Sequence, residues 1–279
     1  MDLPVVEEYI PGQPTASLVP PGNCVFSEEW APAPLLKRKW IGHDTLLLTF
    51  GLPDSQKPLG LSTCACLLAR GETSSSGIDE DLVRPYTPVS TNAMLGAFEI
   101  MVKVYPDGAM SQHIAKLPIG ASLDFKHIKF NVKLQYPFNA QKVVCLIGGT
   151  GVAPMLQALH ALLGTPTDLS QTTVVYSSKS QADILARSTL DAWEAAHPHR
   201  LRVHHTLTRE PVDSGWTGRR GRIDERLLHE LLPPPSDDLL IFVCGPPSMY
   251  ESLSGARTDM ELTGLLADMG YSAEQVVKF

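Results

Sequence analysis

The chain has 279 residues, 43% of them hydrophobic and 19% charged, which is enough for two globular domains with buried cores. Its 30 acidic residues outnumber the 23 basic ones, and the net charge of -7 argues against nucleic acid or an anionic membrane surface as a partner. The five cysteines are scattered, with no CxxC pair and no histidine cluster beside them. We therefore expect reduced thiols in a cytoplasmic protein, and no metal site.

Residues 1–32 form a proline-rich segment without lysine or arginine. No apolar run in it is long enough to span a bilayer, and no targeting signal can be recognised. The sequence APAP at 31–34 cannot continue a regular helix. We expect an irregular leader that lies over the rest of the molecule.

Residues 33–139 contain short β-like runs separated by Gly, Pro, Ser and Asp, which predict an antiparallel β-barrel as the first domain. The runs are LLKRKWI, TLLLTFGL, STCACLLA, AFEIMVKVY and SLDFKHI. Alternation along STCACLLA would place Cys64 and Cys66 on one face of a strand, which favours packing over a thiol-dependent activity. One helix is expected, at 110–116.

Residues 140–279 alternate between apolar strands and helices, which predicts a second domain with a doubly wound parallel α/β sheet. The predicted strands are KVVCLIGG, TTVVYSS, LRVHHTLT and LLIFVCG, and the predicted helices cover 152–163, 183–196 and 223–232 and follow Pro247. In such sheets ligands bind at the carboxyl ends of the strands.

The sequence RPYTPVS at 84–90 places a cation, an aromatic ring and two hydroxyls on one predicted strand. Alternation would put Arg84, Tyr86, Pro88 and Ser90 on one face, with Thr87 available through its backbone and hydroxyl. These groups suit a flavin, which needs a cation for its phosphate, a ring against the isoalloxazine and a hydrogen-bond partner near N5. An edge strand with a surface tyrosine and arginine explains the seven residues equally well.

Three glycine-containing turns precede predicted helices. The first, with Gly108 and Ser111, offers a helix N-terminus to a pyrophosphate, although a capped helix without a ligand explains it better when it is taken alone. The second, GGTGVAPM at 148–155, follows a buried strand and favours a bound ligand, although it is not the GxGxxG fingerprint. The third, CGPPSM from Cys244, brings a thiol to the same edge, where a structural role is more usual than a nucleophilic one.

In this order, the four motifs resemble the ferredoxin-NADP reductase superfamily, and within it the NADH-cytochrome b5 reductases. The resemblance extends from about residue 34 to residue 279 and includes DTLLLTFGLP, VKVY, AMSQHI and LPPP. It implies FAD and NADH as cofactors, and hydride transfer followed by the release of single electrons to cytochrome b5 or a similar haem protein. We expect a monomer.

The resemblance also implies the site residues. Arg84 would lie near the FAD phosphates, Tyr86 against the flavin ring and Thr87 near N5, so that Thr87 and Cys244 are the predicted catalytic residues. The remaining predicted FAD contacts are Pro85, Met101, Lys103, Gly108, Met110 and Ser111. The predicted contacts of the nicotinamide dinucleotide are Gly149, Thr150, Gly151, Thr208, Arg209, Cys244, Gly245, Pro246 and Met249, with Phe279 near the flavin.

Two departures from the family pattern leave alternatives open. Ala109 stands where the family usually has a basic residue that helps to dock acidic cytochrome b5, so a diaphorase or a ferredoxin-type reductase is the rival enzyme. A flavin-free interaction module on the same fold is the rival outside enzymes. Thr208 stands where relatives carry an Asp that repels a 2'-phosphate, and together with Arg209 it resembles the Ser-Arg pair of NADPH-using relatives. NADPH is therefore a second candidate donor, unless Arg209 pairs with Glu210 or solvent.

Overall fold

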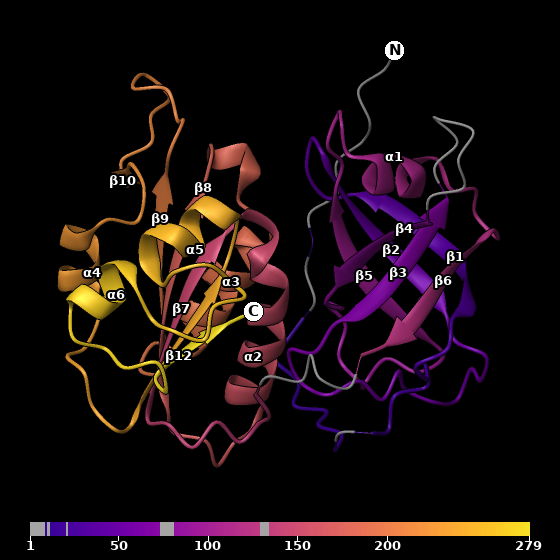
Figure 1. Cartoon of the computed structure of the whole chain (residues 1–279), viewed down its shortest axis with the longest axis horizontal. Coiled ribbons are helices and arrows are strands. Elements are labelled where there is room, and N and C mark those ends of the chain that lie inside the picture. Colours follow the sequence, from indigo (N-terminus) through magenta and orange to yellow (C-terminus); the bar gives the residue numbers. More distant parts are fainter. Residues whose placement is uncertain (1–8, 10–11, 21, 73–80, 129–133) are drawn as a thin grey trace.

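The computed structural model describes residues 9, 12–20, 22–72, 81–128 and 134–279, which form two domains lying side by side (Figure 1). Residues 1–8, 10, 11 and 21 of the predicted leader lie outside this description. Among the helices that are described, none is long and apolar enough to cross a membrane.

The first domain is an antiparallel sheet in the order β4-β3-β6-β1-β2-β5. Its strands are β1 (Ala31–Trp40), β2 (Thr45–Gly51), β3 (Leu67–Glu72), β4 (Asp81–Tyr86), β5 (Ala97–Lys103) and β6 (Ser122–His127). Beyond β4, Pro88 bridges to Ile100 of the opposite edge strand, and the Val89 N–H donates to Glu99 O at 2.8 Å. The two edges of the sheet therefore meet, which confirms the predicted barrel.

The interior of the barrel is filled by aromatic rings. Phe26, Phe50, Phe98 and Phe125 pack with ring centroids between 5.0 and 5.8 Å apart. β6 alternates between exposed and buried residues, as expected of a strand with one face in solvent. β2 is buried along its whole length because its second face, with Leu47, packs against the core of the other domain.

The second domain is a parallel sheet in the order β10-β9-β8-β7-β11-β12, as the sequence predicts. Its strands are β7 (Lys142–Gly148), β8 (Gln171–Ser178), β9 (Leu201–Leu207), β10 (Arg219–Arg220), β11 (Leu239–Cys244) and β12 (Val276–Lys278). One face is covered by α2 (Val152–Gly164) and α3 (Arg187–Ala196), and the other by α4 (Glu225–Leu231), α5 (Pro247–Leu253) and α6 (Gly264–Asp268). The remaining helix, α1 (Ala109–Lys116), belongs to the barrel domain.

Two predicted elements are wrong in their extent. The strand expected over STCACLLA begins only at Leu67, so Cys64 and Cys66 do not share a strand face. Cys64 has a left-handed φ of 61° and lies in a turn. The helix expected over 183–196 begins at Arg187. A 3-10 turn at Gln181–Asp183 precedes it, because the Ser180 and Asp183 side chains form a capping box there.

The first described residues cross the second domain as a strap, which we define as Tyr9 together with residues 12–20. Tyr9 is 5% exposed, and its carbonyl oxygen accepts a hydrogen bond from Thr189 Oγ1 of α3 at 2.8 Å. Trp193 Nε1, also of α3, donates to Gly12 O at 2.7 Å. These bonds attach the strap to the α/β domain.

The strap also reaches α2 and the barrel. The Thr15 N–H donates to His160 Nδ1 of α2 at 3.0 Å, and burial lowers the pKa of His160 to about 4, so the imidazole is a neutral acceptor at ordinary pH. The Tyr9 hydroxyl donates to Val89 O at 3.3 Å, and Asn92 Nδ2 donates to Ser17 O at 3.2 Å. The strap therefore joins the two domains.

We expect Gly164→Ala to lower the melting temperature. Alanine favours a helix over glycine by about 1 kcal/mol, so the change would stabilise the end of α2 if nothing lay over it. A Cβ at Gly164 would lie 2.4 Å from Ala16 N, however, and would displace the strap. The expected fall is roughly 3–8 °C in thermal unfolding followed by circular dichroism. The same substitution in a chain that begins at Gly22 serves as the control and should be stabilising, whereas a rise in the intact chain would contradict a docked strap.

Candidate functional site

A cavity of about 930 Å³ lies between the barrel and the α/β domain, near the upper end of the usual range for small-molecule sites. Every site residue predicted from the sequence, from Arg84 to Phe279, lines it. Within the part of the chain that the structure describes, Asp183 is the only acidic residue in the lining, although the whole chain is acidic. The basic residues of the lining are Arg84, Lys103, Lys179, Arg209, Arg222 and Arg257. This excess of positive charge suits a ligand that carries several phosphates.

The segment from Arg84 to Thr87 forms the barrel side of the cavity. All four residues line it, Arg84, Pro85 and Tyr86 from the end of β4 and Thr87 directly after the strand. The expectation that Pro88 and Ser90 share the face of Arg84 and Tyr86 is wrong, because β4 ends at Tyr86 and neither Pro88 nor Ser90 is part of the lining. Burial raises the pKa of Tyr86 to about 12, so its hydroxyl stays protonated and remains a hydrogen-bond donor.

The turn before α1 forms the next part of the wall. Ser111 Oγ donates to Gly108 O at 2.9 Å and accepts from the Tyr105 N–H at 3.1 Å, so this hydroxyl shapes the turn. Met110 is 3% exposed and belongs to the barrel core. No side chain caps the N-terminus of α1, so its first N–H groups can receive an anion.

Two glycine-containing loops meet at the carboxyl ends of β7 and β11. A Cβ at Gly151 would lie 2.1 Å from Cys244 O, and a Cβ at Gly148 would lie 2.7 Å from the Pro246 side chain. The Tyr176 hydroxyl of β8 donates to Gly149 O at 2.9 Å and so fixes the loop that follows β7. Only glycine allows this approach, so the first loop presents mainly backbone to the cavity.

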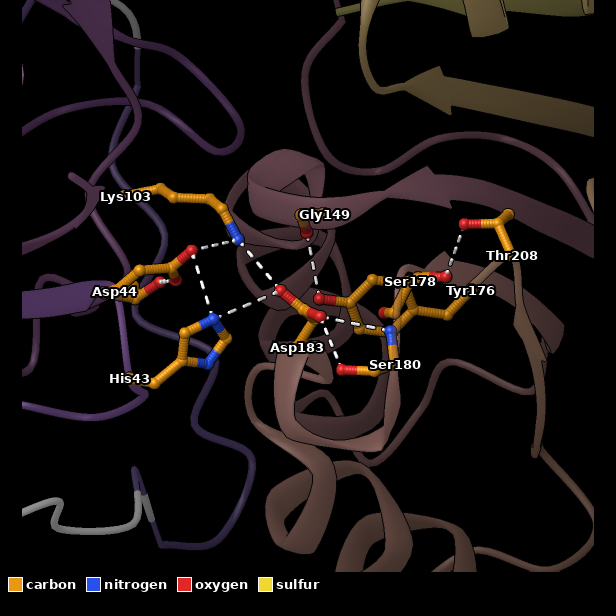
Figure 2. A network of polar contacts seen from close by, with 10 residues as sticks. His43, Asp44, Lys103, Gly149, Tyr176, Ser178, Ser180, Asp183 and Thr208 are labelled. Carbon is orange, nitrogen blue, oxygen red and sulfur yellow. Dashed lines mark hydrogen bonds and ion pairs between the residues drawn. The ribbon is translucent and has the colours of Figure 1, made fainter. Parts of the chain in front are cut away.

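An ion-pair network joins the two domains beside the cavity, as Figure 2 shows. Lys103 Nζ, from the end of β5, lies 2.7 Å from Asp44 Oδ2 in the barrel and 3.1 Å from Asp183 Oδ1 in the α/β domain. The other oxygen of Asp183 accepts from the N–H of Ser180 at 3.1 Å and from its hydroxyl at 2.6 Å. The ammonium of Lys103, predicted from the sequence as an FAD contact, is therefore bound to two carboxylates.

Burial and the ion pairs act in opposite directions on this network. Burial alone would lower the pKa of Lys103, but Asp44 and Asp183 outweigh it and the pKa is raised. Burial alone would raise the pKa of Asp183, but hydrogen bonds from Ser180 and Lys103 outweigh it and the pKa is lowered. Lys103 and Asp183 are therefore both charged at neutral pH.

His43 extends the network. Its Nε2 lies 3.5 Å from Asp44 Oδ2 and 3.8 Å from Asp183 Oδ1. These three side chains could offer ligand atoms to a metal ion, but the Lys103 ammonium already forms an ion pair with each of the two carboxylates. The arrangement is thus an interdomain ion-pair cluster.

The far end of the cavity is lined by Thr208 and Arg209, which follow β9. Thr208 Oγ1 donates to Ser178 O at 3.2 Å. Arg209 does not pair with Glu210, because both carboxylate oxygens of Glu210 accept from Gln181, each at 2.8 Å. Among the described residues, no ion-pair partner is found for the Arg209 guanidinium, so this part of the cavity can receive an anion.

Several lining residues were not identified from the sequence. Lys179, Arg222 and Arg257 are exposed residues in loops, and no local pattern distinguishes them from other surface cations. Asp183 could have been identified only as part of a capping box with Ser180, a signal that predicts a helix start and not a cavity.

Comparisons with known proteins agree with this geometry. The family model described as the oxidoreductase FAD-binding domain matches residues 32–133, and that described as the oxidoreductase NAD-binding domain matches residues 145–254. The chain is 38% identical to NADH-cytochrome b5 reductase 2 of Aspergillus fumigatus, over 90% of this chain and 77% of that protein. It is 36% identical to an NADH-cytochrome b5 reductase-like protein of Arabidopsis thaliana, over 93% of this chain and 79% of that protein.

A solved structure shows the same likeness over both domains. The cytochrome b5 reductase domain of Ulva prolifera nitrate reductase superimposes with a TM-score of 0.79 and 29% identity, covering 92% of this chain and 99% of that one. Both domains, their order and the cavity between them are thus accounted for by one known family. The chain belongs to the NADH-cytochrome b5 reductase family and is an FAD-dependent NADH oxidoreductase.

Proposed function

We propose that the chain passes electrons from NADH, through FAD, to cytochrome b5 or a similar small haem protein. The names of its relatives support this acceptor. The observation that carries the proposal is the single cavity, which brings the predicted flavin segment and the predicted nicotinamide turn together from two domains. Direct hydride transfer requires this proximity, because the two rings must stack about 3.5 Å apart.

Each predicted site residue would have a role set by the part of the cofactor that it contacts. Arg84 would pair with an FAD phosphate, Tyr86 would pack on the flavin ring and Thr87 would hydrogen-bond near its N5. The turn at Gly149–Gly151 would receive the nicotinamide, and Cys244 beside it would align the ring. FAD, when bound, would supply the chemistry of accepting a hydride and releasing two electrons one at a time.

The test is an anaerobic visible spectrum of the purified protein before and after addition of NADH. We expect flavin bands that bleach on addition. A protein that stays colourless after incubation with FAD would overturn the proposal and leave the interaction module.

The electron acceptor is tested by adding cytochrome b5 to the reduced protein and following the reduction of its haem by absorbance. Rapid reduction of ferricyanide or a quinone without haem reduction would favour a diaphorase, and reduction of ferredoxin alone would favour a ferredoxin-type reductase.

A second candidate donor is NADPH. Arg209 is exposed at the end of the cavity, and Lys179 and Arg222 line the same cavity. Arginine suits a 2'-phosphate because it can donate two parallel hydrogen bonds. Comparable kcat/KM values for NADH and NADPH would support this candidate, and a large preference for NADH would contradict it.

We expect Arg209→Ala to lower kcat/KM for NADPH about tenfold, since a hydrogen bond to a charged group is worth about 1.5 kcal/mol or more. The value for NADH should change by less than about twofold, because NADH lacks the 2'-phosphate. Steady-state kinetics with both donors measure the split. Arg202→Ala is the matched control, since Arg202 is exposed on β9 but does not line the cavity.

A further inference from the structure

Directly after the predicted flavin segment, three successive carbonyl groups bind donors from outside the barrel. Gln157 Nε2 donates to Pro88 O at 2.8 Å and to Ser90 O at 2.6 Å. The Tyr9 hydroxyl donates to Val89 O between them, at 3.3 Å. Carbonyls two residues apart in an extended chain point to the same side, so one carboxamide NH2 group, with its two donors, can bind both.

The other side of the same three residues is bound to β5. The Val89 N–H donates to Glu99 O at 2.8 Å, and Ser90 Oγ accepts from the Glu99 N–H at 2.9 Å. The segment is therefore held between the barrel and α2. Because Thr87 immediately precedes it, the position of Thr87 depends on both contacts.

α2 links this contact to the nicotinamide turn. The helix begins at Val152, directly after the turn at Gly149–Gly151, and faces the barrel (Figure 1). Met155, Leu156 and Leu159 have no exposed surface, so the helix is packed firmly into the α/β domain. Gln157 is six residues beyond Gly151, which is about 9 Å along a helix axis.

We infer that Gln157 is a positioning residue that holds the flavin segment in register with the nicotinamide turn. One rigid helix carries the turn at its N-terminus and, less than two turns further on, the carboxamide that binds the flavin segment. A second contact joins the barrel to the same helix: Cys64 Sγ donates a hydrogen bond to Pro154 O at 3.2 Å. It is weaker, because a thiol is a weak donor. The inference rests on the proposed roles of Thr87 and Gly149–Gly151.

The experiment compares Gln157→Met and Gln157→Glu with the unchanged chain, using stopped-flow reduction of the flavin by NADH. Methionine keeps the length of the side chain without a donor, and glutamate keeps the shape with an anion facing two carbonyl oxygens. We expect both variants to lower the saturating rate about tenfold or more at pH 8, because small misplacements of reacting rings are costly. The NADH concentration that gives half of the saturating rate should change by less than about threefold, and so should the Kd of FAD measured by flavin fluorescence.

The pH dependence of the rate in Gln157→Glu distinguishes a positioning role from a simple loss of stability. A carboxyl beside two carbonyl oxygens has a raised pKa, and once protonated it donates one hydrogen bond. Its rate should therefore recover partly as the pH falls from 8 to 6, while that of Gln157→Met should follow the unchanged chain. The long-wavelength charge-transfer band of nicotinamide stacked on flavin should weaken in both variants.

Gln275→Glu is the matched control. Its Nε2 also donates to a backbone carbonyl, that of Ser236 at 2.8 Å, but its hydrogen bonds stay within the α/β domain and reach neither the flavin segment nor the nicotinamide turn. Unchanged saturating rates in both Gln157 variants would overturn the inference, as would a loss confined to FAD or NADH affinity. If the unchanged chain contained no flavin, or if NADH did not bleach its flavin bands, the proposed function itself would be contradicted.

Discussion

Gly151→Ala is expected to slow the reduction of the flavin by NADH about a hundredfold. A Cβ at this position would lie 2.1 Å from Cys244 O and 2.6 Å from Cys244 C, and neither is a flexible side-chain end that could move aside. The loops after β7 and β11 would have to separate. Overpacking of this kind costs about 1–3 kcal/mol, and the separation displaces the predicted nicotinamide turn. Stopped-flow absorbance measures the rate, and the FAD content should be unchanged because residues 84–87 are untouched.

Gly149→Ala is the comparison within the same turn. Gly149 has a φ of +55°, and a Cβ there would meet nothing within 4 Å. Alanine in this conformation costs about 1–2 kcal/mol of backbone strain but creates no clash. We expect a clearly smaller loss of rate than for Gly151→Ala. Equal losses would assign the effect to backbone conformation, and a normal rate for Gly151→Ala would contradict the close approach of the two loops.

Lys103→Met is expected to lower the free energy of unfolding by about 3 kcal/mol. The side chains of Lys103 and Asp183 are 13% and 11% exposed, so removing the ammonium leaves a largely buried carboxylate without its partner. Asp44 and Asp183 would then face each other across the domain boundary as like charges. Urea unfolding followed by tryptophan fluorescence measures the loss. Lys103→Arg keeps the positive charge and should lose much less, and equal losses would mean that packing dominates over charge.

The pH dependence of stability follows from the two pKa shifts. The pKa of Asp183 is lowered from its usual value of about 4, so its contribution is present above that value and is lost as the pH falls through the lowered pKa. The pKa of Lys103 is raised from about 10.4, so its contribution is present below that value and is lost as the pH rises through the raised pKa. The destabilisation by Lys103→Met should therefore be largest between about pH 5 and 10.

Much of the fold could be predicted because its signals are local. The apolar run from Val143 to Ile147, followed by glycines and a helical pattern, predicts a strand, a turn and a helix in the order that the structure shows. The motifs of the site could also be located, since each lies at the end of a strand or the start of a helix. That they line one cavity between two domains followed from the family resemblance, because local patterns carry no information on how the domains are arranged.

What could not be predicted depends on contacts between distant residues. Cys64 looks like part of an alternating strand, but it adopts a φ of 61° and its thiol donates to Pro154 O, which is 90 positions away. Lys103 is predicted as an FAD contact and lines the cavity, but its ion pair with Asp183, 80 positions away, has no signal in the sequence. Gln157 lies in a helix with an apolar pattern, and only the folded chain brings it to the carbonyls of Pro88 and Ser90.

The N-terminal strap limits how the two domains can turn relative to each other. A body attached at one point can rotate about three axes, whereas a body attached at two points can rotate only about the line between them. The α/β domain is attached both by the strap, through Thr189 and Trp193, and by the chain that enters it at β7. Opening the cavity would in addition break the Lys103–Asp183 ion pair and the hydrogen bonds of Gln157, which join the same two domains.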